Sequence, residues 1–176
     1  LKKDNLKARL AFSTIGQLSY IVLGIAILSP LSTAGALYHL VAHAFMKITL
    51  FMCAGAIFVT THKKDISEMV GLGRRMPVTM SAFTIASLGI AGFPFFVGFV
   101  SKANIIMGAL KTGQLLFGAT LIVSAVLALT YLMPVVLITF KREPVNPEFN
   151  TYGEASKTML VPMLITATVS VILGVA

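Results

Sequence analysis

The sequence is poor in charged residues. Only 11% of its 176 residues are charged, whereas about 25% is usual in a soluble domain. Residues 10–46, 76–101 and 112–140 contain no Asp, Glu, Lys or Arg at all, and each run is longer than the roughly 20 apolar residues of a membrane-spanning helix. Together with 57% hydrophobic residues and a mean hydropathy of +0.92, this excludes an ordinary soluble domain and indicates an integral membrane protein.

Patterns typical of metal, redox and nucleotide sites are also missing. The single cysteine, Cys53, lies inside an apolar run, so it forms no disulfide within the chain and is best interpreted as a small packing residue. Zinc-ligand spacing, a glycine-rich phosphate loop and a nucleophile elbow are absent. We therefore expect no metal, no cofactor and no catalytic site in this chain. Nor does the net charge of +8 indicate nucleic-acid binding, because the basic residues lie mainly between apolar runs.

Five apolar segments follow one another along the chain, over residues 10–29, 34–61, 76–110, 114–140 and 158–176. They are too long and too uniformly apolar for barrel strands, and other lipid-exposed spans must be helical. We predict an all-α fold, a polytopic transmembrane helical bundle of about five spans that forms one domain over residues 1–176. Because residue 1 is not Met and no signal peptide precedes the first apolar run, we expect residue 1 to be an internal point of a longer protein.

The basic residues are distributed unequally between the two ends of these segments. One side has eleven of them, namely Lys2, Lys3, Lys7, Arg9, Lys63, Lys64, Arg74, Arg75, Lys141, Arg142 and Lys157. The opposite side has only Lys111. The positive-inside rule therefore predicts a multi-pass protein of the cell inner (plasma) membrane, with the N-terminus of this piece in the cytoplasm and its C-terminus outside.

The third segment is too long for one simple span. As a single helix, residues 76–110 would extend about 52 Å, against a hydrocarbon core of about 30 Å. Pro94 removes a helix hydrogen bond, and Gly92 and Gly98 loosen the backbone around it. We predict a discontinuous helix with its break near Gly92-Phe93-Pro94. The alternative is a proline kink followed by a short surface helix.

Three polar residues recur every fourth position in the second segment, as His39, His43 and Lys47. Residues at this spacing share one helix face, and the stripe covers about 12 Å of the helix axis. A lysine within a span costs at least ~2.5–3.5 kcal/mol on insertion scales, so it faces the bundle interior or a wet cavity. Histidine both accepts and donates protons near neutral pH. We interpret the stripe as a proton relay, bridged by waters.

Two other interpretations of the stripe stay open. The histidines could be hydrogen-bonded packing residues. They could also bind a metal, but the glutamate of a HExxH motif is missing and a lysine one turn away opposes a cation. All six acidic residues fall in loops or flanks, so an anionic partner for Lys47 must come from elsewhere.

Lys102 and Lys7 are further candidates for the relay. Lys102 follows the predicted break, and the apolar stretch after it indicates a buried position, although a lysine that extends to the outer interface is the alternative. Lys7 lies beside other basic residues and by itself resembles an ordinary positive-inside flank.

Three motifs resemble those of one family. Residues 4–20 read DNLKARLAFSTIGQLSY, residues 39–47 read HLVAHAFMK and residues 91–102 read AGFPFFVGFVSK. They resemble the motifs DxLKRxLAYSTIxQxxY, HLxxHAxFK and AGxPPxxGFxSK of the antiporter-like subunits found in respiratory complex I, membrane-bound hydrogenases and Mrp-type sodium/proton antiporters. Residues 71–80, GLGRRMPVTM, are most similar to the antiporter D-subunit branch.

The resemblance implies roles for individual residues. It makes the chain the C-terminal portion of a larger subunit, roughly the tenth to fourteenth of fourteen helices. It also implies that Lys47 lies in a central hydrophilic axis with His39 and His43 as its relay, that Lys102 is the terminal lysine on the broken helix, and that Lys7 belongs to the relay. Phe12 and Phe95 depart from the motifs without removing a titratable group. The family's earlier repeat, with its Glu-Lys pair, is missing.

Three functions remain possible from the sequence. The first is proton or sodium/proton translocation as part of a multisubunit cation/proton antiporter. The second is a proton-pumping membrane subunit of a redox complex, an NADH:quinone oxidoreductase or a membrane-bound hydrogenase. The third is a non-conducting membrane scaffold. The partners we expect are other membrane subunits of a hetero-oligomeric complex, the N-terminal part of the same subunit, the lipid bilayer, and protons with or without sodium.

Overall fold

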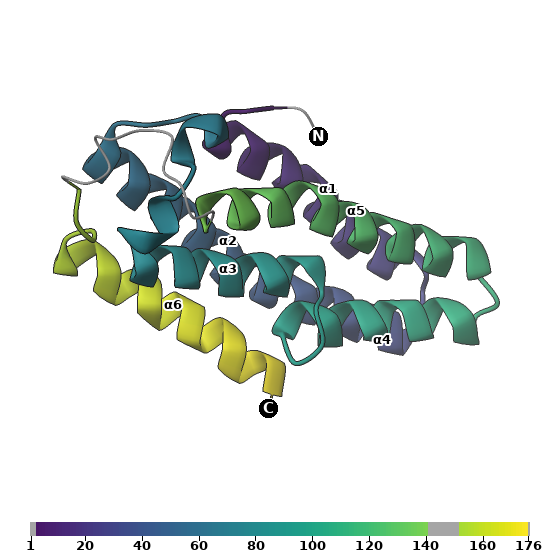
Figure 1. The fold of residues 1–176 in the computed structure, drawn as a ribbon. Helices are drawn as coiled ribbons and strands as arrows, with labels where there is room; N and C mark the ends of the chain where they lie inside the picture. Colours follow the sequence, from purple (N-terminus) through teal and green to yellow (C-terminus); the bar gives the residue numbers. More distant parts are fainter. Residues whose placement is uncertain (1–2, 141–151, 176) are drawn as a thin grey trace.

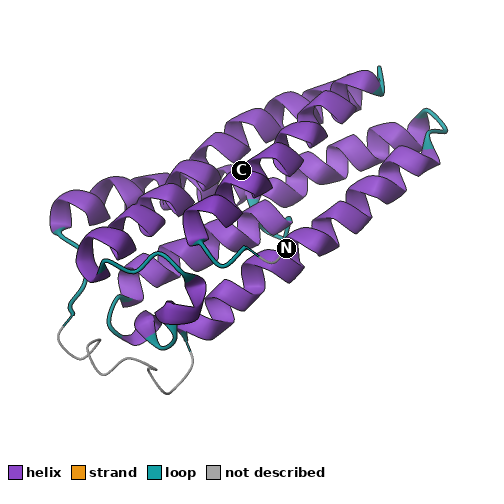
Figure 2. Ribbon diagram, turned by 90° about the horizontal axis from the view of Figure 1, so that it is seen from above, coloured by secondary structure: helices purple, strands orange, loops and turns teal. Residues whose placement is uncertain are grey.

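The chain folds as an elongated bundle of helices that lie side by side (Figures 1 and 2). The computed structural model describes residues 3–140 and 152–175, and within them no strand is formed. The α-helices are α1 (Leu6–Ala26), α2 (Pro30–Thr61), α3 (Pro77–Ala91), α4 (Val97–Lys111), α5 (Leu115–Thr139) and α6 (Lys157–Val175). Two short 3₁₀ helices, η1 (Ile66–Met69) and η2 (Leu72–Arg74), connect α2 to α3. The predicted all-α fold is confirmed.

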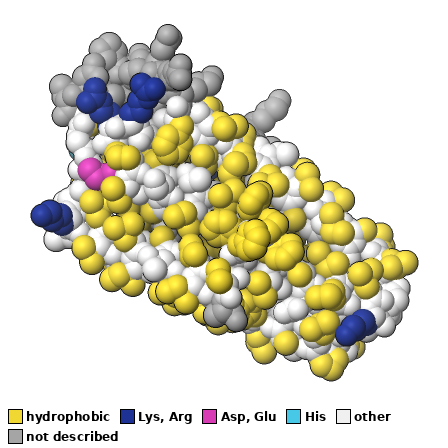
Figure 3. Space-filling view, turned by 60° about the horizontal axis from the view of Figure 1, so that its bottom comes forward, with side chains coloured by type: hydrophobic (Ala, Val, Ile, Leu, Met, Phe, Trp, Pro, Cys, Tyr) yellow, Lys and Arg dark blue, Asp and Glu magenta, His cyan; other side chains and the backbone are white. Residues whose placement is uncertain are grey.

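The helices have the length and surface of membrane spans. In the described part of the chain, α1, α2, α5 and α6 are each long and apolar enough to cross a bilayer. Large apolar side chains are exposed along them, among them Val22 (69%) and Leu116 (75%). Figure 3 shows one face that is largely apolar along its length. Such a face is stable against lipid tails, and we describe the chain as a membrane-spanning bundle.

Helix α2 is the centre of the bundle and packs against α1, α3, α4 and α6. It begins at Pro30, which suits the first helical position, and ends where His62 adopts a left-handed conformation. Its 32 residues extend about 48 Å, more than the hydrocarbon core alone requires. Ala36, Ala42 and Ala56 are fully buried, and small residues of this kind let neighbouring membrane helices approach closely.

The third apolar segment is interrupted, as the sequence predicted. Helix α3 ends at Ala91, and Gly92 follows in the left-handed region with φ +84°. The Gly92 N–H donates to Gly89 O, and the Phe93 N–H donates to Leu88 O, both at 3.0 Å. These two bonds satisfy carbonyls of the last turn and end the helix. Pro94 comes next, and α4 begins at Val97. Because α4 packs against α2 and is not a surface helix, the alternative of a kinked span is wrong.

The two halves of the broken span touch at glycine. A Cβ atom placed on Gly98 would collide with Gly89 O and lie 3.0 Å from Gly89 C. The first turn of α4 therefore rests directly on the last turn of α3, which only a residue without a side chain allows. Of the three residues named for the break, Gly92 ends α3, Pro94 lies between the halves, and Gly98 permits their contact.

Polar contacts gather at the end of the bundle where α1, α3 and α6 begin. Helix α1 begins earlier than the apolar run suggested, because Asn5 Oδ1 accepts a hydrogen bond from Ala8 N at 3.0 Å and caps the helix. Lys7 and Arg9 therefore lie in its first turns. At the start of α3, Glu154 accepts hydrogen bonds from Val78 N at 2.8 Å and Thr79 Oγ1 at 2.5 Å. Lys2, Lys141 and Arg142, which contributed to the predicted orientation, lie outside the described residues.

Candidate functional site

The stripe of His39, His43 and Lys47 lies inside the bundle. Their exposed fractions are 0%, 5% and 6%. The two imidazole rings stack with centroids 6.1 Å apart and planes 21° apart, so the ring nitrogens do not bond one another directly. His43 Nδ1 is buried and finds no hydrogen-bond partner among the described residues. A buried polar atom in this state accommodates a water or a proton donor.

Lys47 is held by a hydroxyl group. Its Nζ donates a hydrogen bond to Ser13 Oγ of α1, and Ser13 Oγ donates to Leu10 O at 2.8 Å. Within the described residues no acidic side chain pairs with Lys47. An ion pair between Lys63 and Glu68, at 3.9 Å, lies in the connection from α2 to α3. The Lys47 ammonium is therefore bound by neutral oxygen and not by a carboxylate.

His39 connects α1 to α4. Its Nε2 lies 3.2 Å from Gln17 Oε1 of α1, and its Nδ1 lies 2.8 Å from Ser101 Oγ of α4. The Tyr20 ring meets the imidazole edge to face, with centroids 5.6 Å apart. The Tyr20 hydroxyl points away and donates to Ser124 Oγ of α5 at 2.6 Å. Both ring nitrogens of His39 are thus bonded, one to Gln17 and the other to Ser101, and neither partner belongs to the stripe on α2.

Lys102 lies at the helix break. Its Nζ donates to Ile90 O at 2.6 Å and lies 4.9 Å from the centre of the Tyr20 ring. Lys102 is only 4% exposed, so it does not extend to an interface. Ile90 is in the last turn of α3, where carbonyls lack helical partners and carry the negative end of the helix dipole. A Cβ at Gly92 would lie 3.0 Å from Lys102 Cδ, so Gly92 also leaves room for this side chain.

These contacts form two neighbouring groups of buried polar residues. Lys47 bonds Ser13, whereas His39 contacts Gln17, Ser101, Tyr20 and His43, with Lys102 over the Tyr20 ring. The groups lie one helical turn apart on α1 and α2. We call the two groups together the polar line, and its members are Ser13, Gln17 and Tyr20 of α1, His39, His43 and Lys47 of α2, and Ser101 and Lys102 of α4. The structure brings four of the five predicted translocation residues into it. Lys7 lies elsewhere: it is exposed, with its Nζ 5.0 Å from the Phe58 ring. Its place in a relay stays a prediction from resemblance.

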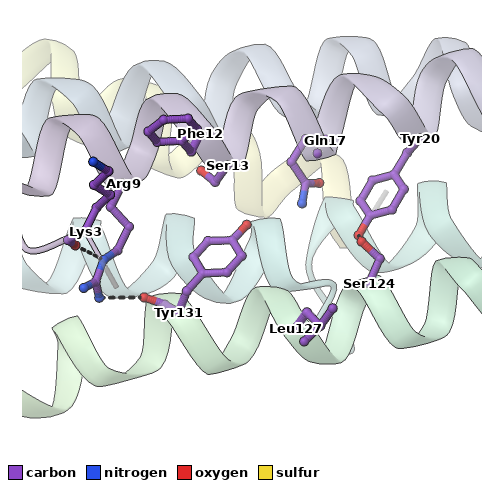
Figure 4. Close-up of a pocket in the computed structure, with 10 residues that line it drawn as sticks. Lys3, Arg9, Phe12, Ser13, Gln17, Tyr20, Ser124, Leu127 and Tyr131 are labelled. Atoms are coloured by element: carbon purple, nitrogen blue, oxygen red, sulfur yellow. Dashed lines mark hydrogen bonds between the residues drawn. The ribbon is translucent and has the colours of Figure 1, made fainter. Parts of the chain in front are cut away.

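A cavity of about 290 Å³ lies beside the polar line, between α1 and α5 (Figure 4). Ser13 and Gln17 contribute to its wall, and the Tyr131 hydroxyl points between them (Figure 4). Near one end of the cavity, Arg9 Nη1 donates to Tyr131 O at 3.3 Å. The cavity has room for several water molecules, since one water occupies roughly 30 Å³ in the liquid. It borders Ser13 and Gln17, the residues that bond Lys47 and His39.

The sequence analysis missed the partners of the stripe. Ser13, Gln17 and Tyr20 stand at i, i+4 and i+7, so they line one face of an apolar helix. That periodicity was a usable signal. Ser101, next to Lys102, had no signal of its own. Among residues 3–140 and 152–175, no three His, Cys, Asp or Glu side chains come together as a metal site.

Known proteins share this chain's sequence and fold. Residues 1–143 match the family described as "NADH:quinone oxidoreductase/Mrp antiporter, TM". The chain is 36% identical to NADH-quinone oxidoreductase subunit N of Desulforudis audaxviator, over 94% of this chain and 35% of that protein. It is 40% identical to NADH-quinone oxidoreductase subunit L of Mycobacterium tuberculosis, over 98% of this chain and 28% of that protein.

A solved structure shows the same arrangement of helices. A chain of the membrane-bound sulfane sulfur reductase, an archaeal respiratory membrane complex, superposes with a TM-score of 0.89 at 30% identity. The match covers 98% of this chain and 28% of that chain. The present chain therefore spans about a third of the length of the curated relatives that it matches.

Proposed function

The chain belongs to the NADH:quinone oxidoreductase/Mrp antiporter transmembrane family, and on this premise we propose that it carries protons across a membrane as part of a multisubunit cation/proton antiporter. One observation supports this most directly. Four ionisable residues, His39, His43, Lys47 and Lys102, are buried inside apolar helices, and each contacts a hydroxyl, amide or aromatic group. Such residues are too costly to bury without a function.

The chemistry of the polar line favours protons as the ion it handles. Amine and imidazole nitrogens gain and lose protons, whereas hard cations such as sodium prefer oxygen ligands. The side-chain oxygens of Ser13, Gln17 and Ser101 are each bonded to a lysine or histidine nitrogen, and the Tyr20 hydroxyl is bonded to Ser124. In this proposal His39 and His43 pass protons between Lys47 and Lys102, and water fills the gaps. Coupling to sodium would then depend on groups in other parts of the assembly.

The rest of the conduit lies in other helices. The chain spans about a third of its curated relatives, and we propose that it is one transmembrane unit of a longer antiporter-like subunit. The remaining partners are then the N-terminal part of that subunit and neighbouring membrane subunits. The assignment to the D-subunit branch belongs to the same proposal.

A redox-linked pump is the second candidate function. It is favoured by the names of the two relatives, which are both NADH-quinone oxidoreductase subunits. The polar line would work in the same way, and the partners would differ. Purification of the intact assembly decides between the two: flavin and iron–sulfur subunits would indicate the redox complex, and membrane subunits alone would indicate the antiporter.

A non-conducting scaffold predicts another environment for Lys47. In a scaffold, this lysine would face lipid or lack a polar neighbour. Lys47 is instead 6% exposed and bound to Ser13, which supports conduction over a scaffold.

Replacing Lys47 tests the proposed function. In the intact assembly, reconstituted into sealed vesicles, we expect Lys47→Ala to lower proton flux by about 100-fold or more, the usual effect of removing a proton-transfer group. Flux is measured with a pH-sensitive dye inside the vesicles. Lys111→Ala is the matched control, because Lys111 is exposed at the end of α4. Undiminished flux in Lys47→Ala would contradict the proposal.

A further inference from the structure

Each nitrogen of His39 has one partner, and the two partners are not equivalent. Gln17 Oε1 faces Nε2 at 3.2 Å, and Ser101 Oγ faces Nδ1 at 2.8 Å. His39 and Ser101 are fully buried, and Gln17 is 1% exposed. Bulk water therefore does not reach the ring in this conformation. Any proton that His39 exchanges passes one of these two side chains.

Gln17 determines which nitrogen keeps its proton. An amide oxygen is an acceptor only, so the nitrogen that it faces must carry hydrogen. A neutral imidazole has one N–H and one lone pair. With Gln17 Oε1 on Nε2, neutral His39 therefore has its proton on Nε2 and its lone pair on Nδ1, which faces Ser101 and α4.

Ser101 can satisfy Nδ1 in both of its protonation states. A hydroxyl has one hydrogen to donate and lone pairs to accept with. Ser101 Oγ lies 3.0 Å from Gly98 O as well as 2.8 Å from Nδ1. When Nδ1 carries a lone pair and no hydrogen, the Ser101 hydroxyl donates to it. When Nδ1 carries a proton, the hydroxyl accepts from it and turns its own hydrogen to Gly98 O. Neither state leaves an unsatisfied buried group.

We propose that Gln17 and Ser101 are positioning residues that make proton exchange at His39 one-sided, at Nδ1 and through Ser101. The inference rests on the proposed function, in which His39 carries protons. In the step itself, Ser101 Oγ passes its hydrogen to Nδ1 and takes one proton from a donor on the α4 side, a water-borne proton or a protonated amine. The donor loses one proton, His39 gains one and becomes an imidazolium, and Ser101 is unchanged. While Gln17 holds Nε2, release is the reverse of this step. Transfer onward across His39 takes place from Nε2, after the Gln17 amide has moved away from it.

The titratable neighbours of His39 are consistent with proton exchange on the α4 side. Among the described residues, the titratable groups around it are Tyr20 of α1, His43 of α2 and Lys102 of α4. Tyr20 presents its ring, and its hydroxyl is bonded to Ser124. Lys102 follows Ser101 on α4, and its Nζ donates to Ile90 O and lies 4.9 Å from the centre of the Tyr20 ring. Movement of the Gln17 amide would let Nε2 release its proton toward the cavity, so Gln17 controls the opposite side.

A pair of substitutions at Ser101 separates proton transfer from packing. Flux is measured in the intact assembly in sealed vesicles. We expect Ser101→Ala to lower it about 10-fold or more, because the hydroxyl that passes the proton is lost, and Ser101→Thr to restore much of it because the hydroxyl returns. A packing role predicts the reverse order, since alanine fits the space of serine and threonine adds a methyl group. That reverse order would overturn the inference.

Substitutions at Gln17 shift the pH profile in opposite directions. Gln17→Glu puts a negative acceptor on Nε2 and holds the imidazolium to higher pH, so the pH of half-maximal flux should rise by about one unit or more. Gln17→Leu removes the acceptor, and this pH should fall. Gln114→Glu and Gln114→Leu make the same changes at the turn between α4 and α5 and should leave the profile in place. Equal or absent shifts at Gln17 would refute its assigned role.

A spectroscopic readout keeps the test independent of transport. Infrared difference spectra of the intact assembly with isotope-labelled histidine report the imidazolium as pH is varied. One buried histidine should stay protonated to higher pH in Gln17→Glu, and should lose its proton at lower pH in Gln17→Leu. If Lys47→Ala keeps full flux, the proposed function fails. If Lys47→Ala is inactive while Ser101→Ala and both Gln17 variants match the unmodified assembly, only the present inference fails.

Discussion

At the scale of single residues, the chain buries two lysines without giving either a carboxylate partner among the described residues. Lys47 donates to the Ser13 hydroxyl, and Lys102 donates to the Ile90 carbonyl at 2.6 Å. Ile90 O belongs to the end of α3, where the helix dipole is negative. The break thus supplies Lys102 with a fixed partial negative charge. A partial charge binds an ammonium less tightly than a carboxylate would, which suits a group that must release its proton.

Arginine at position 102 distinguishes proton release from a fixed positive charge. Lys102→Arg keeps the charge near Ile90 O, but a guanidinium does not lose its proton in proteins. We therefore expect flux to fall by about 100-fold or more in vesicles that contain the intact assembly, although the charge is retained. Lys111→Arg, at an exposed position, serves as the control. Normal flux in Lys102→Arg would mean that Lys102 acts as a static charge.

At the scale of elements, local signals predicted the helices well and their contacts poorly. The break over residues 92–96 could be predicted, because Gly92 and Pro94 determine the backbone locally, whatever packs around them. The shared face of His39 and Lys47 followed from helical periodicity alone. The bonds to Gln17 and Ser101 could not be predicted, because they depend on how α1 and α4 rotate against α2. That rotation is determined by packing over the whole interface.

The contact between the halves of the broken span gives a prediction at this scale. Gly98→Ala adds a Cβ against Gly89 O, so α4 must shift, at a cost of about 1–3 kcal/mol. We expect a lower midpoint of thermal unfolding in detergent and reduced flux, because Lys102 lies one turn further along α4. Gly55→Ala is the matched control, since nothing lies within 4 Å of its added Cβ. It should be neutral or slightly stabilising. Equal midpoints for the two variants would show that the α3–α4 contact tolerates a side chain.

At the scale of the whole molecule, the apolar surface and the polar line have complementary roles. The exposed apolar side chains of α1 and α5 suit lipid or neighbouring apolar helices, while the polar line lies between α1, α2 and α4. The cavity between α1 and α5 lies between the apolar surface and the polar line. Ser13 and Gln17 form part of its wall, and they also bond Lys47 and His39. The cavity therefore reaches the partners of Lys47 and His39, while Lys47 and Lys102 themselves stay buried.

The orientation of the bundle in the membrane is the last prediction. The starts of α1, α3 and α6 lie at one end of the bundle, and the end of α4 lies at the other (Figure 1). The connection from α2 to α3, at the first end, carries Lys63, Lys64, Arg74 and Arg75, whereas Lys111 is the last residue of α4. The positive-inside rule then places Lys64 in the cytoplasm and Lys111 outside. Labelling of single cysteines in intact cells with a membrane-impermeant maleimide tests this. Cys53 is buried, and its replacement by alanine gives a background without cysteine. Lys111→Cys should react in intact cells, and Lys64→Cys only after the membrane is opened. The opposite pattern would reverse the orientation, and with it the side of the membrane on which the Arg9 end of the cavity lies.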